Sequence, residues 1–123
     1  MSAFAFNQVS TDLTVAVDKT DCSGLFSCVG GGCPLNHSVT SDTVTAAGSE
    51  GQAPYTYAWA RVSGDATITA TSAATAATAF AASVGRNATK TAVFQCTVTD
   101  NLGKQAVSAP VNVRLTYDWD SGL

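Results

Sequence analysis

Residues 91–103, with the sequence TAVFQCTVTDNLG, hold the clearest strand-and-turn pattern of the chain. Ala92, Phe94, Cys96 and Val98 recur at every second position, and from Phe94 onward polar residues stand between them, which is the period of a strand with one buried face. The residues DNLG that follow predict a turn, because Asp and Asn side chains bond the nearby backbone and Gly accepts a positive φ. This segment therefore predicts a strand that packs against a core and ends in a tight turn.

The rest of the chain repeats this pattern in shorter runs. Each run is rich in Val, Thr, Tyr or Ala, and turn-forming residues separate neighbouring runs, as GSEG does at 48–51. We expect further strands at 13–17, 43–47, 55–59, 66–70, in the second half of 71–83, and at 111–115. About seven short strands divided by turns are typical of a two-sheet sandwich, so we predict an all-β domain.

Charged residues are few and scattered along the 123-residue chain. They make up 12% of the sequence, with a formal net charge of −3, and this share is about half the usual one. The six Lys and Arg residues form no basic patch, so we expect neither nucleic acid nor a membrane as a partner. The first residues show neither the basic nor the apolar part of an export signal, so we expect synthesis in a cytoplasm.

One segment between the first two expected strands, residues 21–38, is rich in Cys and Gly. Cys22, Cys28, Cys33 and His37 have the spacing C-x5-C-x4-C-x3-H, and three thiolates with one imidazole are a favoured zinc ligand set. We therefore consider a structural zinc site that pins this loop. The alternatives are one disulfide, for example Cys22 with Cys28 or Cys33, or three free thiols.

The sequence contains no combination of residues that is typical of catalysis. Glu50 and Asp65 lie in separate turns, and the glycines at 30–32 lack the Lys-Ser/Thr of a phosphate-binding loop. We therefore predict a protein that is not an enzyme, with no catalytic residues and no cofactor beyond the zinc considered above.

Two motifs resemble a known group of domains. Residues 53–59, APYTYAW, and residues 94–103, FQCTVTDNLG, resemble Ig-like and PKD-like domains, particularly those in head and tail proteins of tailed bacteriophages. The resemblance implies an immunoglobulin-like β-sandwich of about seven antiparallel strands, with the Cys/Gly-rich insertion between the first two. It also implies that Trp59 packs in the core. The second-strand Cys of antibody domains is absent, so we expect Cys96 to be a buried free thiol.

The resemblance further implies a non-catalytic virion protein, either a capsid decoration or a tail-associated subunit that acts through protein–protein contacts. Its partners would be capsid or tail subunits or further copies of itself, and it would join the virion after synthesis in the host cytoplasm. The alternative function is a carbohydrate- or cell-surface-binding adhesion module, with a host surface glycan as ligand.

We expect three parts in the chain: an N-terminal arm at 1–11, the sandwich at 12–116 and a C-terminal tail at 117–123. The arm contains Phe4 and Phe6, and the expected tail contains Tyr117 and Trp119. We expect at least one of these apolar ends to dock onto a neighbouring subunit.

Overall fold

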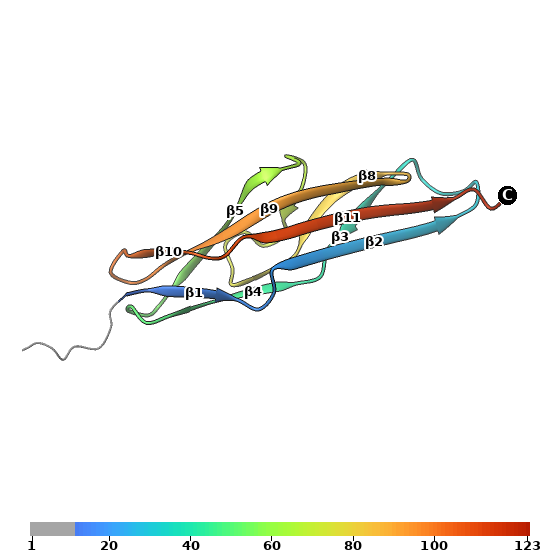
Figure 1. The fold of residues 1–123 in the computed structure, drawn as a ribbon. Coiled ribbons are helices and arrows are strands. Elements are labelled where there is room, and N and C mark those ends of the chain that lie inside the picture. The colour runs from blue at the N-terminus through green and yellow to red at the C-terminus, as the bar shows by residue number, and fades with distance from the viewer. Residues whose placement is uncertain (1–11) are drawn as a thin grey trace, which may run out of the picture.

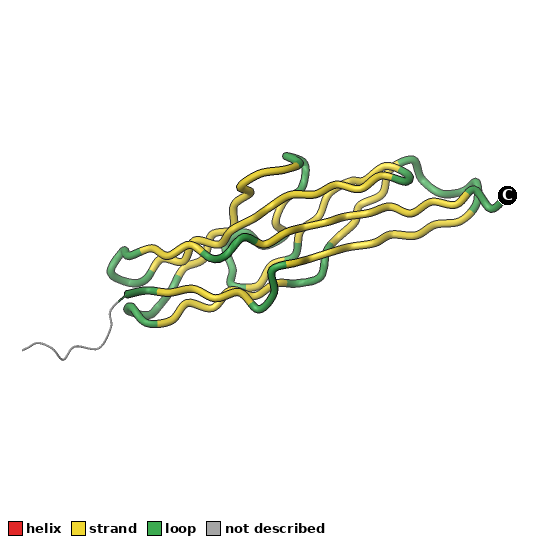
Figure 2. Tube along the Cα trace, in the orientation of Figure 1, coloured by secondary structure: helices red, strands yellow, loops and turns green. Residues whose placement is uncertain are grey.

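The structure is a computed structural model that describes residues 12–123. These residues form eleven strands in an elongated sandwich (Figures 1 and 2). They include no helix, and so none with the length and hydropathy of a membrane span. The predicted all-β, immunoglobulin-like sandwich is confirmed. The expected N-terminal arm, residues 1–11, lies outside the described residues.

One layer is a five-stranded sheet. β9 pairs with β5 along one edge and with β10 and β11 along the other, and β11 in turn pairs with β2. The β2–β11 pair is parallel, whereas the other pairs of this sheet are antiparallel. The strands are β2 (Asp21–Val29), β5 (Thr56–Gly64), β9 (Ala88–Thr99), β10 (Gln105–Val107) and β11 (Val111–Asp120).

The other layer consists of two three-stranded antiparallel sheets, in the orders β1-β4-β7 and β3-β8-β6. The expected strand in the second half of 71–83 is present as β7 and β8. The strands of this layer are β1 (Thr14–Val17), β3 (Asn36–Thr40), β4 (Val44–Ser49), β6 (Thr69–Ala70), β7 (Ala77–Thr78) and β8 (Phe80–Gly85).

An aromatic cluster joins the two layers. Trp59 of β5 is 6% exposed and lies opposite Cys96 in the β5–β9 register. The predicted core position of Trp59 is confirmed. Phe80 of β8 is fully buried, with ring centroids 5.9 Å from Trp59 and 4.4 Å from Phe94. The indole Nε1 donates to the Thr75 carbonyl oxygen at 3.0 Å, so the buried ring keeps a hydrogen bond.

The structure differs from the sequence-based expectation at residues 21–38. We expected one loop there, but β2 and β3 occupy most of it and only residues 30–35 connect them. Even-numbered side chains of β2 face inward, and Gly24 stands where an added Cβ would overlap the Thr40 carbonyl oxygen. This close approach requires a glycine. The parallel pairing of β2 also departs from the expected all-antiparallel arrangement.

The last strand extends further than expected. β11 continues to Asp120, and Tyr117 is fully buried. Tyr117 and Trp119 continue the inward alternation of Val113 and Leu115, and β11 pairs with β2 over the whole length of β2. Residues 117–120 therefore belong to the sandwich and are not a tail.

The predicted turn after β9 is held by one carboxylate. Asp100 is 5% exposed and accepts backbone hydrogen bonds from Gln52 at 3.2 Å and from Leu102 and Lys104 at 2.9 Å each. Burial opposes ionisation of Asp100, but hydrogen bonds from the Lys104, Gln52 and Leu102 amides outweigh it and lower the carboxyl pKa. Asp100 thus ties the residue 52 loop to the β9–β10 turn.

We predict that Asp100→Asn lowers the free energy of unfolding at neutral pH and flattens its dependence on pH under acid conditions. A carboxyl whose pKa is lowered in the folded state stabilises the fold above its unfolded pKa, near 4, and this contribution is lost as the pH falls through the folded pKa. Urea denaturation at about pH 7 and about pH 2.5 measures both effects. The exposed Asp118→Asn variant is the control, and equal stability of Asp100→Asn and the unmodified chain at neutral pH would contradict the prediction.

Candidate binding surface at the disulfide end

The four residues considered as zinc ligands do not converge. Cys28 and Cys33 form a disulfide with a Cα–Cα distance of 5.9 Å, so neither sulfur is available as a thiolate. Cys22 is a buried free thiol near the start of β2, and His37 lies on β3. Within residues 12–123 no group of three or more Cys, His, Asp or Glu side chains is arranged to hold a metal. The set therefore does not fit zinc, and the disulfide joins Cys28 to Cys33 rather than Cys22 to either.

His37 has an aromatic contact instead of a metal. Its ring stacks on Phe26 of β2 with centroids 3.6 Å apart and an interplanar angle of 3°, and its Nδ1 lies 2.7 Å from the Ser38 carbonyl oxygen. The Tyr117 ring meets the Phe26 ring edge-on at 4.9 Å. These rings bring β2 and β3, which belong to different layers, into contact beside the disulfide.

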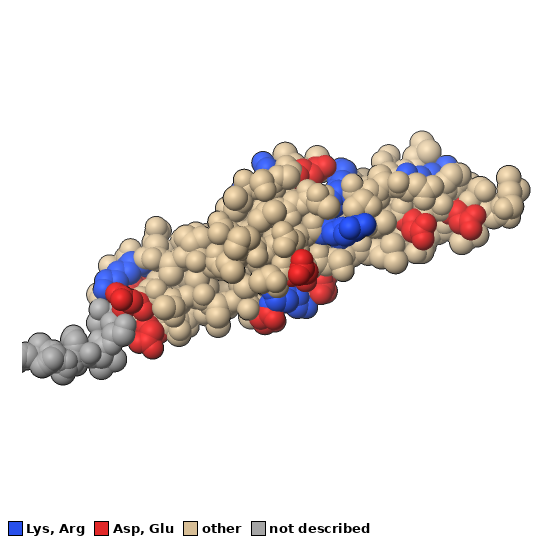
Figure 3. All heavy atoms as spheres, in the orientation of Figure 1, with Lys and Arg blue, Asp and Glu red and all other residues tan. Residues whose placement is uncertain are grey.

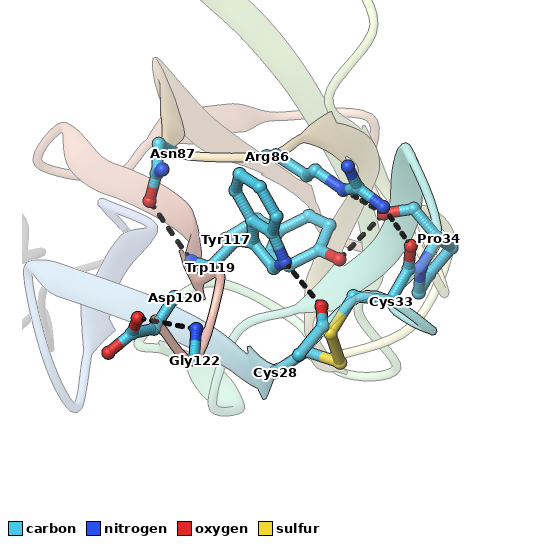
Figure 4. Close-up of a disulfide and its surroundings, with 10 residues drawn as sticks. Cys28, Cys33, Pro34, Arg86, Asn87, Tyr117, Trp119, Asp120 and Gly122 are labelled. Atoms are coloured by element: carbon cyan, nitrogen blue, oxygen red, sulfur yellow. Dashed lines mark hydrogen bonds between the residues drawn. A yellow bond between two sulfur atoms is a disulfide. The ribbon is translucent and has the colours of Figure 1, made fainter.

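The disulfide closes the short connection between β2 and β3, and the β11 residues Tyr117 and Trp119 lie beside it (Figure 4). The Trp119 indole Nε1 donates to the Gly30 carbonyl oxygen at 2.9 Å, and the Gly30 amide donates to Asp120 at 2.8 Å. The Tyr117 hydroxyl donates to the Pro34 carbonyl oxygen at 2.7 Å. Both ends of the Gly-rich loop are therefore bonded to the last strand.

Arg86, in the β8–β9 turn, adds a third attachment. Its guanidinium lies 4.3 Å from the centroid of the Trp119 ring, a cation–π contact. Its Nε donates to the Pro34 carbonyl oxygen at 3.1 Å, and an Nη donates to the Cys33 carbonyl oxygen. The Arg86 side chain thus connects the β8–β9 turn to both the loop and β11. These contacts fix the conformation of the loop.

Two of the four cysteines remain as thiols, and neither is poised to react. Burial raises the pKa of Cys22 to about 11, and burial also raises the pKa of Cys96. Both are neutral at physiological pH, whereas the thiolate is the reactive form. They behave as small apolar core residues, which confirms the expectation for Cys96.

A hollow of about 390 Å³ lies on the outer face of the five-stranded sheet. The Asn112 Nδ2 lies 3.4 Å from the Asp21 carboxylate, on one side of the hollow. The Arg114 side chain is exposed and forms no ion pair with any described residue. The polar residues that line the hollow are Asp21, Ser63, Thr91, Asn112 and Arg114.

Comparison with known proteins places the fold in a family. The model of the family described as "K319L-like, PKD domain" matches residues 35–115, more than half of the chain. The chain belongs to this PKD domain family. PKD domains of this kind are typically non-catalytic.

A solved PKD domain is also similar to this one. The solution structure of the PKD domain (329–428) from human KIAA0319 matches with 12% sequence identity and a TM-score of 0.43. The match covers 98% of this PKD domain and 93% of that one. No curated protein sequence matches the chain.

Sequence reasoning missed Arg86, Tyr117 and Trp119 as parts of this end of the molecule. The available signal was the alternation VNVRLTYDW at 111–119, whose inward positions continue without interruption through Tyr117 to Trp119. The Arg86–Trp119 contact left no such signal, because the two residues lie 33 positions apart and their pairing depends on the fold.

We predict that the Cys28→Ser/Cys33→Ser variant unfolds with a free energy about 2 kcal/mol lower, because a short closed loop removes only modest entropy from the unfolded chain. Urea denaturation measures this difference, and reductant should shift the midpoint of the unmodified chain and leave the double variant unchanged. In denaturant without reductant, the unmodified chain should show two titratable thiols, from Cys22 and Cys96. A count of four thiols, together with one bound zinc per chain, would contradict the disulfide and support the zinc site.

Proposed function

We propose that this PKD domain is a non-catalytic structural subunit of a tailed-phage virion, a capsid decoration or tail-associated protein that acts through contacts with neighbouring proteins. The resemblance of residues 53–59 and 94–103 to phage head and tail domains motivates the proposal. The disulfide is compatible with it, because a virion protein made in the host cytoplasm later meets an oxidising medium.

The observation that carries the proposal is the exposure of large apolar side chains at both ends of the sandwich. Val29 and Leu35, which flank the disulfide loop, are each 71% exposed. At the other end, Leu102 in the β9–β10 turn is 69% exposed and Val107 on β10 is 57% exposed (Figure 1). Most of the face drawn in Figure 3 is uncharged, and its Lys, Arg, Asp and Glu side chains stand in small groups, some of them toward the two ends. A subunit with neighbours at both ends would cover the exposed apolar side chains.

We predict that the chain cosediments with virions in a density gradient, in stoichiometric amount, when particles from the producing culture are probed with an antibody to it. Incorporation of Leu102→Lys/Val107→Lys should drop by roughly tenfold or more, because charges at an apolar contact must be desolvated. The control is Val62→Lys, which introduces the same charge at an exposed position on β5 away from both ends. Virions that lack the chain altogether would overturn the proposal.

A second candidate function is glycan binding, and the hollow on the outer face of the sheet favours it. Its volume falls within the range of small-ligand sites. Hydroxyl and amide groups of Ser63, Thr91 and Asn112 suit the hydroxyls of a sugar, and the Arg114 guanidinium suits a carboxylate. Tyr55 and Tyr57 are less suitable for stacking on a sugar, because both side chains are half-buried and their hydroxyls bond the backbone.

We predict that, if this second function operates, carboxylate-bearing glycans bind in an array and the Arg114→Gln variant loses about tenfold or more of the affinity. Lys90→Gln is the control, because it removes one cation from the same sheet at a residue that does not line the hollow. The Lys90 side chain alternates with the outer-face residues of β9 and donates to the Thr67 hydroxyl instead. A blank array alongside cosedimentation with virions would exclude the glycan function and leave the structural one.

A further inference from the structure

Within residues 12–123, one backbone edge of β2 has no strand partner. Among the described strands β2 pairs only with β11. Asn112 donates to the Thr20 carbonyl oxygen at 2.8 Å and Gly30 donates to the Asp120 carbonyl oxygen at 2.8 Å, so the even-numbered residues direct their backbone groups to β11. Backbone groups of successive residues in a strand point to opposite sides. The odd-numbered residues of β2 therefore direct their N–H and C=O groups away from the sheet.

Only the first part of this edge is occupied. Asp42 accepts the Ser23 amide at 2.8 Å through its carboxylate and donates its own amide to the Ser23 carbonyl oxygen at 3.1 Å. Within residues 12–123, no backbone hydrogen bond is recorded on the outer side of Leu25, Ser27 or Val29. These three residues present the repeated donor and acceptor groups that an additional strand requires.

The usual protections of an edge strand are missing here. β2 contains no Pro, Lys or Arg, and its register with β11 is unbroken over nine residues, without a bulge. On the outer face beside the edge, Leu25 is 66% exposed and Val29 is 71% exposed. The inner face is fixed by the Phe26–His37 stack and the disulfide, so the edge is rigid before any partner arrives.

The sequence supplies a segment that fits this edge. Residues 1–11, MSAFAFNQVST, contain no charged residue, no Gly and no Pro, and residues 3–6 alternate Ala and Phe. Alternation of small and large apolar residues without charge is the composition of a strand that adds to an existing sheet. These residues lie outside the described part of the structure, which begins at Asp12.

The position of Asp12 indicates which copy provides the strand. The described chain begins beside β1, at the end of the elongated sandwich opposite the disulfide (Figure 1). To reach Leu25–Val29 of its own molecule, the N-terminal segment would have to run back along the domain. If the disulfide end of a second copy lies next to this end, the β2 edge of that copy is close to the segment. The segment then does not have to run back along its own domain.

We propose that residues 3–7 of one chain add as an extra strand to the Leu25–Val29 edge of a second copy, with Phe4 and Phe6 covering Leu25 and Val29. This inference rests on the proposed structural function and specifies one of its contacts. The N-terminal segment and the β2 edge are different surfaces at opposite ends of the domain. When two copies pair, one copy therefore keeps an unused β2 edge and the other keeps an unused N-terminal segment. Repetition produces a head-to-tail row of subunits.

The test uses the purified full chain. In sedimentation and light scattering it should self-associate as its concentration rises, and Phe4→Ser/Phe6→Ser should weaken the association by roughly a hundredfold through loss of two apolar anchors. Ser27→Pro should have a similar effect, because it removes an N–H on the free edge and none on the β11 side. Leu25→Lys provides a second edge variant, and Val62→Lys is the exposed control that should associate normally.

Amide hydrogen exchange locates the contact. The amides of Leu25 and Ser27 should become protected with rising concentration in the unmodified chain and remain unprotected in Phe4→Ser/Phe6→Ser. A chain that stays monomeric at every concentration overturns the proposal. Protection in a monomer, independent of concentration, would place the segment on its own chain, and association that persists in both edge variants would place the contact elsewhere. Because no virion is needed, these outcomes are independent of the virion test.

Discussion

The pairing of β11 with its two neighbours is the interaction on which the rest of the structure depends. β11 runs antiparallel to β9 and parallel to β2, and its inward side chains at Val111, Val113, Leu115 and Tyr117 are buried. Burial of each of the Val and Leu side chains stabilises the fold by on the order of 1.5–3 kcal/mol, so the strand anchors the core as well as the sheet. Without β11, β2 would lose its only strand partner among the described residues.

The same strand determines the character of the disulfide end. Tyr117 and Trp119 are the last two inward residues of β11, and their polar tips bond carbonyl oxygens of the loop between β2 and β3. Arg86 completes the arrangement by lying over Trp119 while bonding the same loop. A connection that contains three consecutive glycines is thereby held in one conformation by contacts that come from elsewhere in the sequence. This rigidity is what makes the neighbouring β2 edge a preformed surface.

The fold was accessible from the sequence wherever the signal was local. The alternation in residues 91–99 and the Asp100 turn follow from period-two patterns and turn chemistry, and the structure confirms both. The core position of Trp59 was implied by the resemblance to Ig-like and PKD-like domains, and the structure confirms it too. The segment at 21–29 was misjudged because Gly24 occupies an inward position while Leu25 and Val29 point outward, which reverses the usual burial of apolar residues. The spacing of the cysteines then suggested a metal site. The pairing of β2 with a strand some ninety residues later has no local signature, and neither does the choice of Cys33 as the partner of Cys28.

The disulfide also affects what happens when the backbone is cut. Gly31 and Gly32 are exposed at the tip, and both lie inside the ring that Cys28 and Cys33 close. Cleavage there would leave two polypeptides joined by the sulfur bridge, with β2 still paired to β11 and β3 to β8. In a medium that contains proteases, cleavage of the backbone at this exposed tip would thus leave the fold of the domain intact.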